Sequence, residues 1–358
     1  MGDKVKAFLK FLVFFASGGI ILYLLYRSQA NAFAEQCLID GIPSDDCNYF
    51  QKIMTDFRSV KIAWLLLVIL MYMASNISRA ARWMMMFKPL GHTVKFKNAL
   101  GTLMIGYFAN LGLPRLGEVL RPVALSRYEK ISVEKVVGTI VAERALDVIM
   151  LLLFIGLALL LEYDRLWSYI LENQAILDKV MPILTSPLFY ILILIFAVSG
   201  ILLIRSAWFK KSKLGVKVFG LVHGLMEGIK SIFNLERPSL FILHTVFIWV
   251  MYFLMTRLCF YAFEPTAGLS LVAGLMVFVF GTLGIVFPSP GGMGSYHALI
   301  MAGLAIYGVE QADSFSYANI IFFTIQLFCN VFFGLLAYIL LPLLNKNYEG
   351  ELSTQNTN

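Results

Sequence analysis

Six runs of apolar residues, each about as long as a membrane span, alternate with polar segments along the chain. A helix rises 1.5 Å per residue, so about 20 apolar residues are needed to cross a hydrocarbon core roughly 30 Å thick. Only helices and closed barrels satisfy their backbone hydrogen bonds in lipid, and the alternating pattern of barrel strands is absent from the sequence. The pattern therefore predicts an all-α polytopic membrane protein. The expected spans are 7–26, 61–86, 136–161, 187–204, 239–263 and 315–342.

Two further apolar regions, 98–130 and 268–308, are interrupted by proline and glycine. The first arm of 98–130 is about 24 Å long at 1.5 Å per residue, which is short for a crossing. We therefore expect a re-entrant helical hairpin that turns near Gly112 and Pro114 and returns to the side from which it entered. The arms of 268–308 are long enough to cross, so an opposed second hairpin and two full spans, making eight, are both open.

The positions of lysine and arginine orient these elements, because cytoplasmic loops of membrane proteins are enriched in both. The N-terminus, the segment after span 61–86 and loop 205–238 are basic, and Lys346 begins the C-terminal tail, whereas loops 27–60 and 162–186 are more acidic. We expect both termini on the cytoplasmic side of the cell (inner) membrane. The net charge of +7 then lies on the face that meets anionic headgroups, and nucleic acid is not needed to explain it.

With this orientation the chain divides into two halves of the same order and opposite topology. Each half contains a span, a long loop, a second span, a hairpin and a third span, and the two halves start on opposite sides. Such an inverted repeat with interrupted helices is typical of transporters that bind their substrate near the middle of the membrane. The predicted units are a first repeat 1–161, a second repeat 162–345 and a cytoplasmic tail 346–358.

The sequences of two loops allow further predictions. Cys37 and Cys47 lie in the expected external loop and can form a disulfide in an oxidising compartment. Loop 205–238 has the spacing of a basic amphipathic helix, which favours binding to the membrane surface over recruitment of a partner such as a lipid-modifying enzyme.

Ionisable side chains inside the apolar regions are the first candidate functional residues, because each charge at a helix centre costs at least about 2.5 kcal/mol. One group of three follows the expected turn of the first hairpin, and another lies inside span 136–161. On a helix each group places at least two of its charges on one face. The two groups are Arg115, Glu118 and Arg121, and Glu143, Arg144 and Asp147.

Two interpretations of these six charges are open. They sum to zero, so they can form a neutral network that fixes the hairpin to the next helix. Alternatively, the arginines bind a lipid phosphate, for which the planar guanidinium is well suited, while the acids orient the arginines or take up a proton. Arg79 and Arg82, near the end of span 61–86, are expected to extend to the membrane surface, with a role in the site as the less favoured alternative.

In the second interrupted region the candidate binding groups are backbone N–H groups rather than charged side chains. Ser289, Gly291, Gly292 and Ser295 precede or begin an expected helix, whose free N–H groups attract anions. Close packing of helices explains the same glycines equally well. His297 follows and can titrate or donate a hydrogen bond between helices. We find no hydrolase, nucleotide-binding or metal-ligand motif, so we expect neither an enzyme nor a cofactor or metal.

Three motifs occur in order along the chain: Asn110-x-x-x-Pro114-Arg115-x-Gly117-Glu118-x-x-Arg121, Glu143-Arg144-x-x-Asp147 and Pro290-Gly291-Gly292-Met293-Gly294. Together they resemble the flippase-like membrane domain of lysylphosphatidylglycerol synthases and its stand-alone relatives, over about residues 5–345. The resemblance implies a lipid-translocating membrane domain, without the separate soluble domain that transfers the aminoacyl group. It also adds Asn110 to the candidate binding residues. Members of the family often carry an acidic residue where this chain has His297, which argues against lysylphosphatidylglycerol as the substrate.

The sequence thus favours a flippase-like transporter that moves a phosphate-bearing lipid between leaflets through a midplane cavity. The lipid, the direction, the energy source and the oligomeric state, including a homo-oligomer, are not specified by these patterns. The alternatives are an intramembrane enzyme acting on a lipid phosphate and an anchoring partner of a lipid-modifying enzyme.

Overall fold

The computed structural model describes most of the chain as helices, and no strand occurs within the described residues. Expected span 7–26 lies within a helix, but most of its side chains fall outside the described part. Much of span 187–204, most of loop 205–238 and the tail 346–358 also fall outside it. The described residues are 3–39, 41–43, 47–112, 115–174, 177–178, 181–182, 185–192, 194–195, 198, 206, 235–287 and 289–345.

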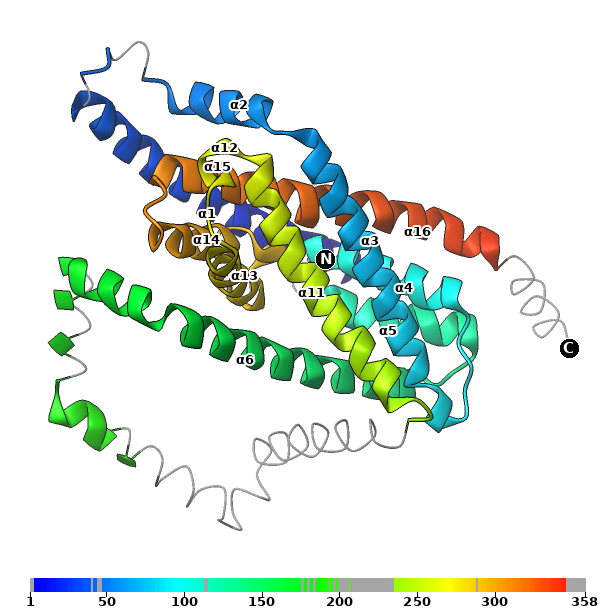
Figure 1. Ribbon diagram of the computed structural model, residues 1–358. Coiled ribbons are helices and arrows are strands. Elements are labelled where there is room, and N and C mark those ends of the chain that lie inside the picture. The colour runs from blue at the N-terminus through cyan, green and yellow to red at the C-terminus, as the bar shows by residue number, and fades with distance from the viewer. Residues whose placement is uncertain are drawn as a thin grey trace, which may run out of the picture.

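Short connections join the helices from α1 to α6 and from α11 to α16 (Figure 1). Their bounds are α1 Asp3–Ile39, α2 Tyr49–Ser59, α3 Ile62–Met85, η1 Lys88–Leu90, α4 Phe96–Gly112, α5 Leu116–Glu129, α6 Val133–Glu172, α11 Pro238–Ala262, α12 Glu264–Ala267, α13 Leu271–Val286, η2 Pro290–Gly292, α14 Ser295–Ala305, α15 Gln311–Ile321, the π-helix η3 Phe322–Cys329 and α16 Asn330–Leu344.

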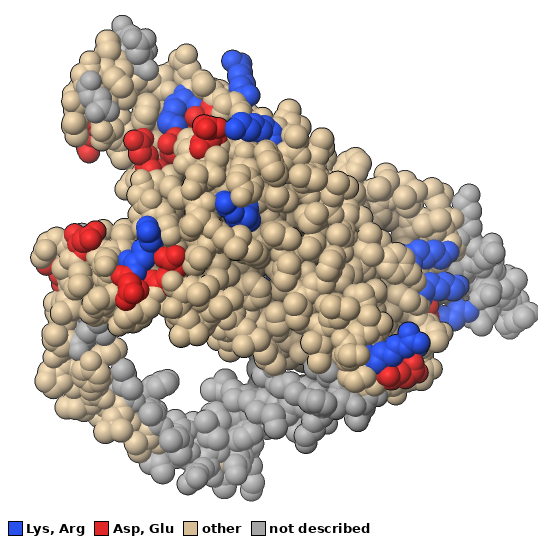
Figure 2. All heavy atoms as spheres, in the orientation of Figure 1, with Lys and Arg blue, Asp and Glu red and all other residues tan. Residues whose placement is uncertain are grey.

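Four helices in the described part are long and apolar enough to cross a membrane: Ile62–Leu90, Val133–Glu172, Pro238–Ala262 and Gln311–Leu344. They confirm four of the expected spans and the prediction of an all-α polytopic membrane protein. Figure 2 agrees with this, because acidic and basic side chains gather at two opposite ends of the molecule and leave an almost uncharged surface between them.

The expected loops 27–60 and 162–186 are more helical than predicted. Helix α1 continues to Ile39, because its sequence has neither proline nor glycine between residues 20 and 39. The disulfide between Cys37 and Cys47 then joins α1 to the start of α2. Helix α6 likewise continues past residue 161 to Glu172, with non-helical backbone only at Glu162.

Helices α3 and α11 form an antiparallel pair at the centre of the fold (Figure 1). An ion pair closes each end of this pair. The Lys61 ammonium lies 2.7 Å from the Glu264 carboxylate at one end, and the Lys88 ammonium lies 2.8 Å from Glu236 at the other. The two ion pairs therefore mark the two ends of the α3–α11 pair.

Both interrupted regions fold as pairs of helices packed against each other, α4 with α5 and α13 with α14. The expectation that both arms of 268–308 are long enough to cross is wrong. The proline- and glycine-rich turn and the early end of α14 leave helices of 16 and 11 residues, short of the roughly 20 that a crossing needs.

Candidate functional site

Six ionisable side chains from three helices meet in the interior and form what we call the arginine cluster. Helix α3 contributes two of them, the α5 arm of the first hairpin contributes one, and α6 contributes three. Four are arginines and two are carboxylates. The members are Arg79, Arg82, Arg121, Glu143, Arg144 and Asp147.

The two carboxylates hold the arginines together. Arg79 donates through Nη1 to Glu143 and, at 3.1 Å, to Asp147. Arg82 Nη2 lies 3.6 Å from an oxygen of each acid. Arg121 Nη2 lies 2.9 Å from Glu143 Oε2 without hydrogen-bonding alignment. Both acids thus bridge α6 to α3, and Glu143 also bridges to α5.

Aromatic and hydroxyl groups complete the surroundings of the cluster. The Arg121 guanidinium stacks 3.7 Å above the centre of the Trp83 ring, a geometry that stabilises a cation. The Trp83 indole N–H donates to Thr139 at 2.9 Å, and Arg82 Nη1 donates to Thr245 at 3.0 Å. The cluster is therefore tied to α6 and α11 as well as to its own carboxylates.

Burial is nearly complete for most of the cluster. Arg79, Arg82, Arg121 and Glu143 are 2%, 0%, 4% and 0% exposed. The Arg144 side chain, by contrast, is 44% exposed and lies at the edge. The cluster is thus closed on most sides and reaches the surface through Arg144.

The charges in the cluster do not balance. Four guanidinium groups face two carboxylates, which leaves two positive charges without a counter-ion in the described part of the chain. The Nε atoms of Arg79, Arg82 and Arg121 also have no hydrogen-bond acceptor there. Buried charges and buried donors without partners are costly. The arrangement is therefore complementary to an added anion with several oxygen atoms.

Arg115 and Glu118 were predicted to belong with Arg121, but both are exposed, and no ion pair involves either within the described residues. Contact between the two arms decides which face of α5 turns inward. Gly117 packs so closely on Gly106 that an added Cβ would lie 2.0 Å from the Gly106 carbonyl oxygen. Residues four apart share a helix face, so the face of α5 that packs Gly117 against α4 also holds Arg121. Glu118 therefore lies on the outward face.

The expectation that Arg79 and Arg82 extend to the membrane surface is wrong, since both are buried in the cluster. They replace Arg115 and Glu118 in the network, which is why the predicted neutral set of six becomes a set with surplus positive charge. A signal in the sequence was available. Ser75, Asn76 and Ser78 precede the two arginines, and a polar run inside an expected span indicates a face turned toward protein rather than lipid.

Asn110 closes the turn of the first hairpin. Its side-chain oxygen accepts a hydrogen bond of 2.7 Å from the Gly117 backbone N–H. Arg115, at the start of α5, has the left-handed backbone angle φ of 64°, and Pro114 lies outside the described residues. Asn110 thus acts on the backbone of the turn, and its side chain makes no hydrogen bond to the arginine cluster within the described residues.

The predicted residues of the second hairpin form a similar closed turn. Ser295 donates to the Gly284 carbonyl at 2.7 Å, and its hydroxyl lies 2.6 Å from that of Ser289. Gly291 and Gly292 have φ of 56° and 82°, in the left-handed region that favours glycine. A Cβ on Gly291 would lie 3.2 Å from Leu111 in α4. The turns of the two hairpins therefore lie against each other.

His297 is fully buried behind this turn. Its ring lies 4.7 Å from the Phe322 ring and 6.2 Å from the Phe315 ring, measured between centroids. Neither ring nitrogen has a partner in hydrogen-bond geometry within the described residues. The structure thus separates His297 from the arginine cluster and places it among aromatic side chains.

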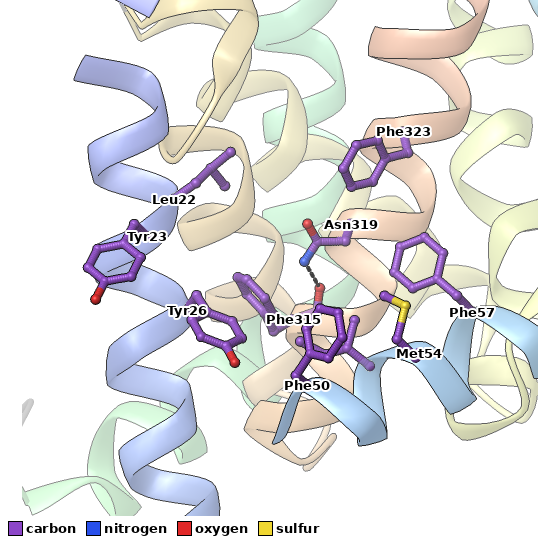
Figure 3. A pocket seen from close by; sticks show the side chains of 10 residues that line it. Leu22, Tyr23, Tyr26, Phe50, Met54, Phe57, Phe315, Asn319 and Phe323 are labelled. Carbon is purple, nitrogen blue, oxygen red and sulfur yellow. Dashed lines mark hydrogen bonds between the residues drawn. The ribbon is translucent and has the colours of Figure 1, made fainter. Parts of the chain in front are cut away.

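A cavity of about 510 Å³ lies between α1, α2 and the α15–η3 helix (Figure 3). Its walls are aromatic and aliphatic apart from Asn319 and the tyrosine hydroxyls, and no member of the arginine cluster lines it. Asn319 donates to the Phe315 carbonyl at 2.8 Å. The cavity suits hydrocarbon rather than phosphate. It is lined by Leu22, Tyr23, Tyr26, Phe50, Ile53, Met54, Phe57, Phe315, Asn319 and Phe323.

Comparison with known proteins gives the family. The model of the lysylphosphatidylglycerol synthase transmembrane region matches residues 49–334. The chain belongs to this family. The match includes the whole arginine cluster and both hairpins, so these features lie within the family's transmembrane region.

This member of the family also resembles a UPF0104 membrane protein of Methanocaldococcus jannaschii, with 29% identity over 106 residues. The aligned part covers 29% of this chain and 32% of the relative, so the chain spans about a third of the length of that protein. No solved structure matches the chain. Membership in a lipid-related family of multi-pass membrane proteins is therefore established.

Proposed function

We propose that the protein is a flippase-like transporter that moves a phosphate-bearing lipid between the two leaflets, and that the arginine cluster binds the phosphate. The observation that carries this proposal is the surplus of two positive charges in a network that is buried, apart from Arg144, inside a membrane-spanning protein. A phosphodiester carries one negative charge and removes half of this surplus, whereas a phosphomonoester carries up to two and can remove all of it.

The geometry of the cluster supports phosphate in particular. Guanidinium groups bind phosphate oxygens through paired N–H donors, and Arg82 and Arg121 both have buried donors without an acceptor. Arg144 at the surface offers a first contact for an entering headgroup. Glu143 and Asp147 are both engaged by arginines. That engagement favours an orienting role and disfavours the alternative in which one of them is a catalytic base.

The packing of the helices supports an inverted repeat that pairs α3 with α11, α4 with α13, α5 with α14 and α6 with α15–α16. The first hairpin arm of each half packs on the last helix of the other half, as α4 does on α16 and α13 does on α6. The second arm packs on the last helix of its own half, as α5 does on α6 and α14 does on α15. These reciprocal contacts are those expected of two halves related by a pseudo-twofold axis.

Opposed re-entrant hairpins complete the proposal. Helices of 16 and 11 residues are too short to cross, and the turns of the two hairpins lie against each other. Backbone that is irregular at membrane depth is tolerated where it is buried in protein. In this arrangement the first hairpin enters from the Lys88–Glu236 end, which we assign to the cytoplasm, and the second enters from the Lys61–Glu264 end.

Headgroup translocation in proteoliposomes tests the proposal. Wild-type protein should move a fluorescent phospholipid, and Arg121→Gln should reduce the rate at least tenfold, whereas Arg121→Lys should retain part of it. Arg165→Gln is a matched control, because Arg165 is a half-exposed arginine on α6 that pairs with Glu162 at 3.3 Å. Equal rates in Arg121→Gln and Arg165→Gln would remove the role assigned to the cluster.

A further inference from the structure

Helix α11 contains one arginine, Arg257, that the proposed phosphate site does not use. Its Nη2 donates to the Tyr261 hydroxyl at 2.7 Å, and its guanidinium lies 4.3 Å from the centre of the same ring. No ion pair involves Arg257 within the described residues. Its Nε and Nη1 atoms are buried there without an acceptor, although the residue as a whole is partly exposed. An uncompensated cation inside a membrane helix is a candidate functional residue.

The depth of Arg257 follows from the register of α3 and α11. Lys61 N–H donates to the Ala262 carbonyl, and Ser78 Oγ lies 2.8 Å from His244 Nδ1. Interpolation between these contacts places Arg257 level with about residue 66 of α3. Arg79 is then roughly 13 residues further along, or about 20 Å at 1.5 Å per residue. Arg257 and the arginine cluster therefore lie toward opposite ends of one helix pair.

The surroundings of Arg257 leave its charge available. Among the described acidic side chains toward this end, Glu264 is engaged by Lys61 at 2.7 Å, and that hydrogen bond lowers the pKa of Glu264. Asp56 and Asp313 are both engaged by Lys52, at 2.7 and 2.6 Å. On the side of α13, Gly274 lies so close that an added Cβ would be 3.1 Å from Arg257 Cδ. The stem of the arginine is thus held between α11 and α13, while two of its donor nitrogens remain without an acceptor.

From these observations we infer that Arg257 is a second phosphate site, which binds the phosphate of a lipid in the leaflet opposite to that served by the arginine cluster. The inference rests on the proposed function and extends it to two stations, one toward each end of the transport path. One arginine and one tyrosine hydroxyl match the single charge of a phosphodiester. With one surplus charge instead of two, and with partial exposure, this station binds more weakly than the cluster.

Lipid binding to the full chain tests the inference independently of transport. Native mass spectrometry in detergent would count bound phosphatidylmethanol, a phosphodiester lipid without a further charged group, with diacylglycerol as the control that lacks phosphate. Wild-type protein should bind two phosphatidylmethanol molecules specifically. Arg257→Gln and Arg82→Gln should each bind one, and the double variant none. Arg165→Gln should match the wild type.

Inorganic phosphate distinguishes the source of the bound group. If it displaces the lipid at millimolar concentration from the Arg257 station, that station binds free phosphate rather than a lipid, and the inference as stated is overturned. Equal lipid binding by the wild type and Arg257→Gln also overturns it. Folding of each variant is checked by its melting temperature.

Transport separates this inference from the proposed function. In proteoliposomes of one protein orientation, Arg257→Gln should raise the half-saturating lipid fraction at least fivefold from the leaflet at the Lys61–Glu264 end only. Arg257→Lys should restore most of the loss. Absence of transport by the wild type refutes the proposed function, whereas transport that Arg257→Gln leaves unchanged from both leaflets refutes only the second station.

Discussion

The second arm of each hairpin packs on the helix that follows it, α5 on α6 and α14 on α15, but the two arms present different chemistry to that helix. The α5 arm places Arg121 against Glu143 of α6, 2.9 Å away, inside a network of charges. The α14 arm places His297 against Phe315 of α15 and Phe322 of η3, among aromatic rings. From Leu258 to Asn345 the sequence contains no lysine or arginine.

The difference between the hairpins distinguishes the residues that stabilise the fold from the residues proposed to bind a ligand. Both hairpins are closed by glycines in tight contact and by a polar side chain that bonds to the backbone of the turn, Asn110 in the first and Ser295 in the second. Only the first hairpin adds surplus charge. In the proposed function, both hairpins supply architecture, the arginine cluster supplies strong phosphate binding and Arg257 supplies a weaker phosphate station.

Loss of a carboxylate from the cluster should have the largest effect. Glu143→Gln removes one of two anions that face four arginines, and breaking a buried ion pair from one side costs about 3–5 kcal/mol. We expect a melting temperature in detergent far below that of the wild type. Glu118→Gln, on the exposed side of α5, is the matched control and should unfold like the wild type. Similar melting of the two variants would contradict the network.

Loss of an arginine from the same cluster should act in the opposite direction on stability. Arg82→Gln reduces the surplus of positive charge, and glutamine can still donate to Thr245. We expect unchanged or higher thermal stability without lipid, together with translocation at least tenfold slower, a change of about 1.4 kcal/mol. A loss of stability as large as that of Glu143→Gln would show that the arginines serve the fold alone.

The glycines of the two hairpins should respond alike. A Cβ on Gly117 would lie 2.0 Å from the Gly106 carbonyl oxygen, and one on Gly284 would lie 2.7 Å from the Tyr296 Cα. Because backbone must move in both cases, Gly117→Ala and Gly284→Ala should each lose about 1–3 kcal/mol. Gly138→Ala, with nothing within 4 Å, should be neutral or slightly stabilising. A large difference between the two hairpins would break their architectural equivalence.

The contact between α2 and α15 should give the smallest effect. Partial burial lowers the pKa of the Lys52 ammonium, but hydrogen bonds to Asp313 and Asp56 outweigh it and raise this pKa above its usual value. Stability from this group is therefore fully present below the usual lysine pKa of about 10.4 and is lost as the pH rises through the folded value. Unfolding measured from pH 9 upward should show a loss of about 1 kcal/mol or less, absent in Lys52→Met. The same loss in that variant would exclude Lys52 as its source.

The membrane class and four spans could be predicted because long apolar runs dominate those segments. The pair of Glu143 and Asp147 could be predicted too, since residues four apart share a helix face, and both contact Arg79. The inward positions of Arg79 and Arg82 were not predicted, although the polar residues before them indicate a face of α3 turned toward protein. The spacing of residues does not reveal that α6 and α11 are the helices that this face meets. Likewise Glu118 was assigned inward because the contact between Gly106 and Gly117 joins two helices and has no local signature.

The central claim is that the arginine cluster binds the phosphate of a lipid. The most direct measurement is the rise in melting temperature of the detergent-solubilised protein as phosphatidylmethanol is added, because a ligand that binds only the folded state stabilises it by about 2.7 kcal/mol at a hundred times its dissociation constant. We predict a saturable rise in the wild type, a rise less than half as large in Arg82→Gln, and none with diacylglycerol. An equal rise in the wild type and in Arg82→Gln, or an equal rise with diacylglycerol, would contradict the account.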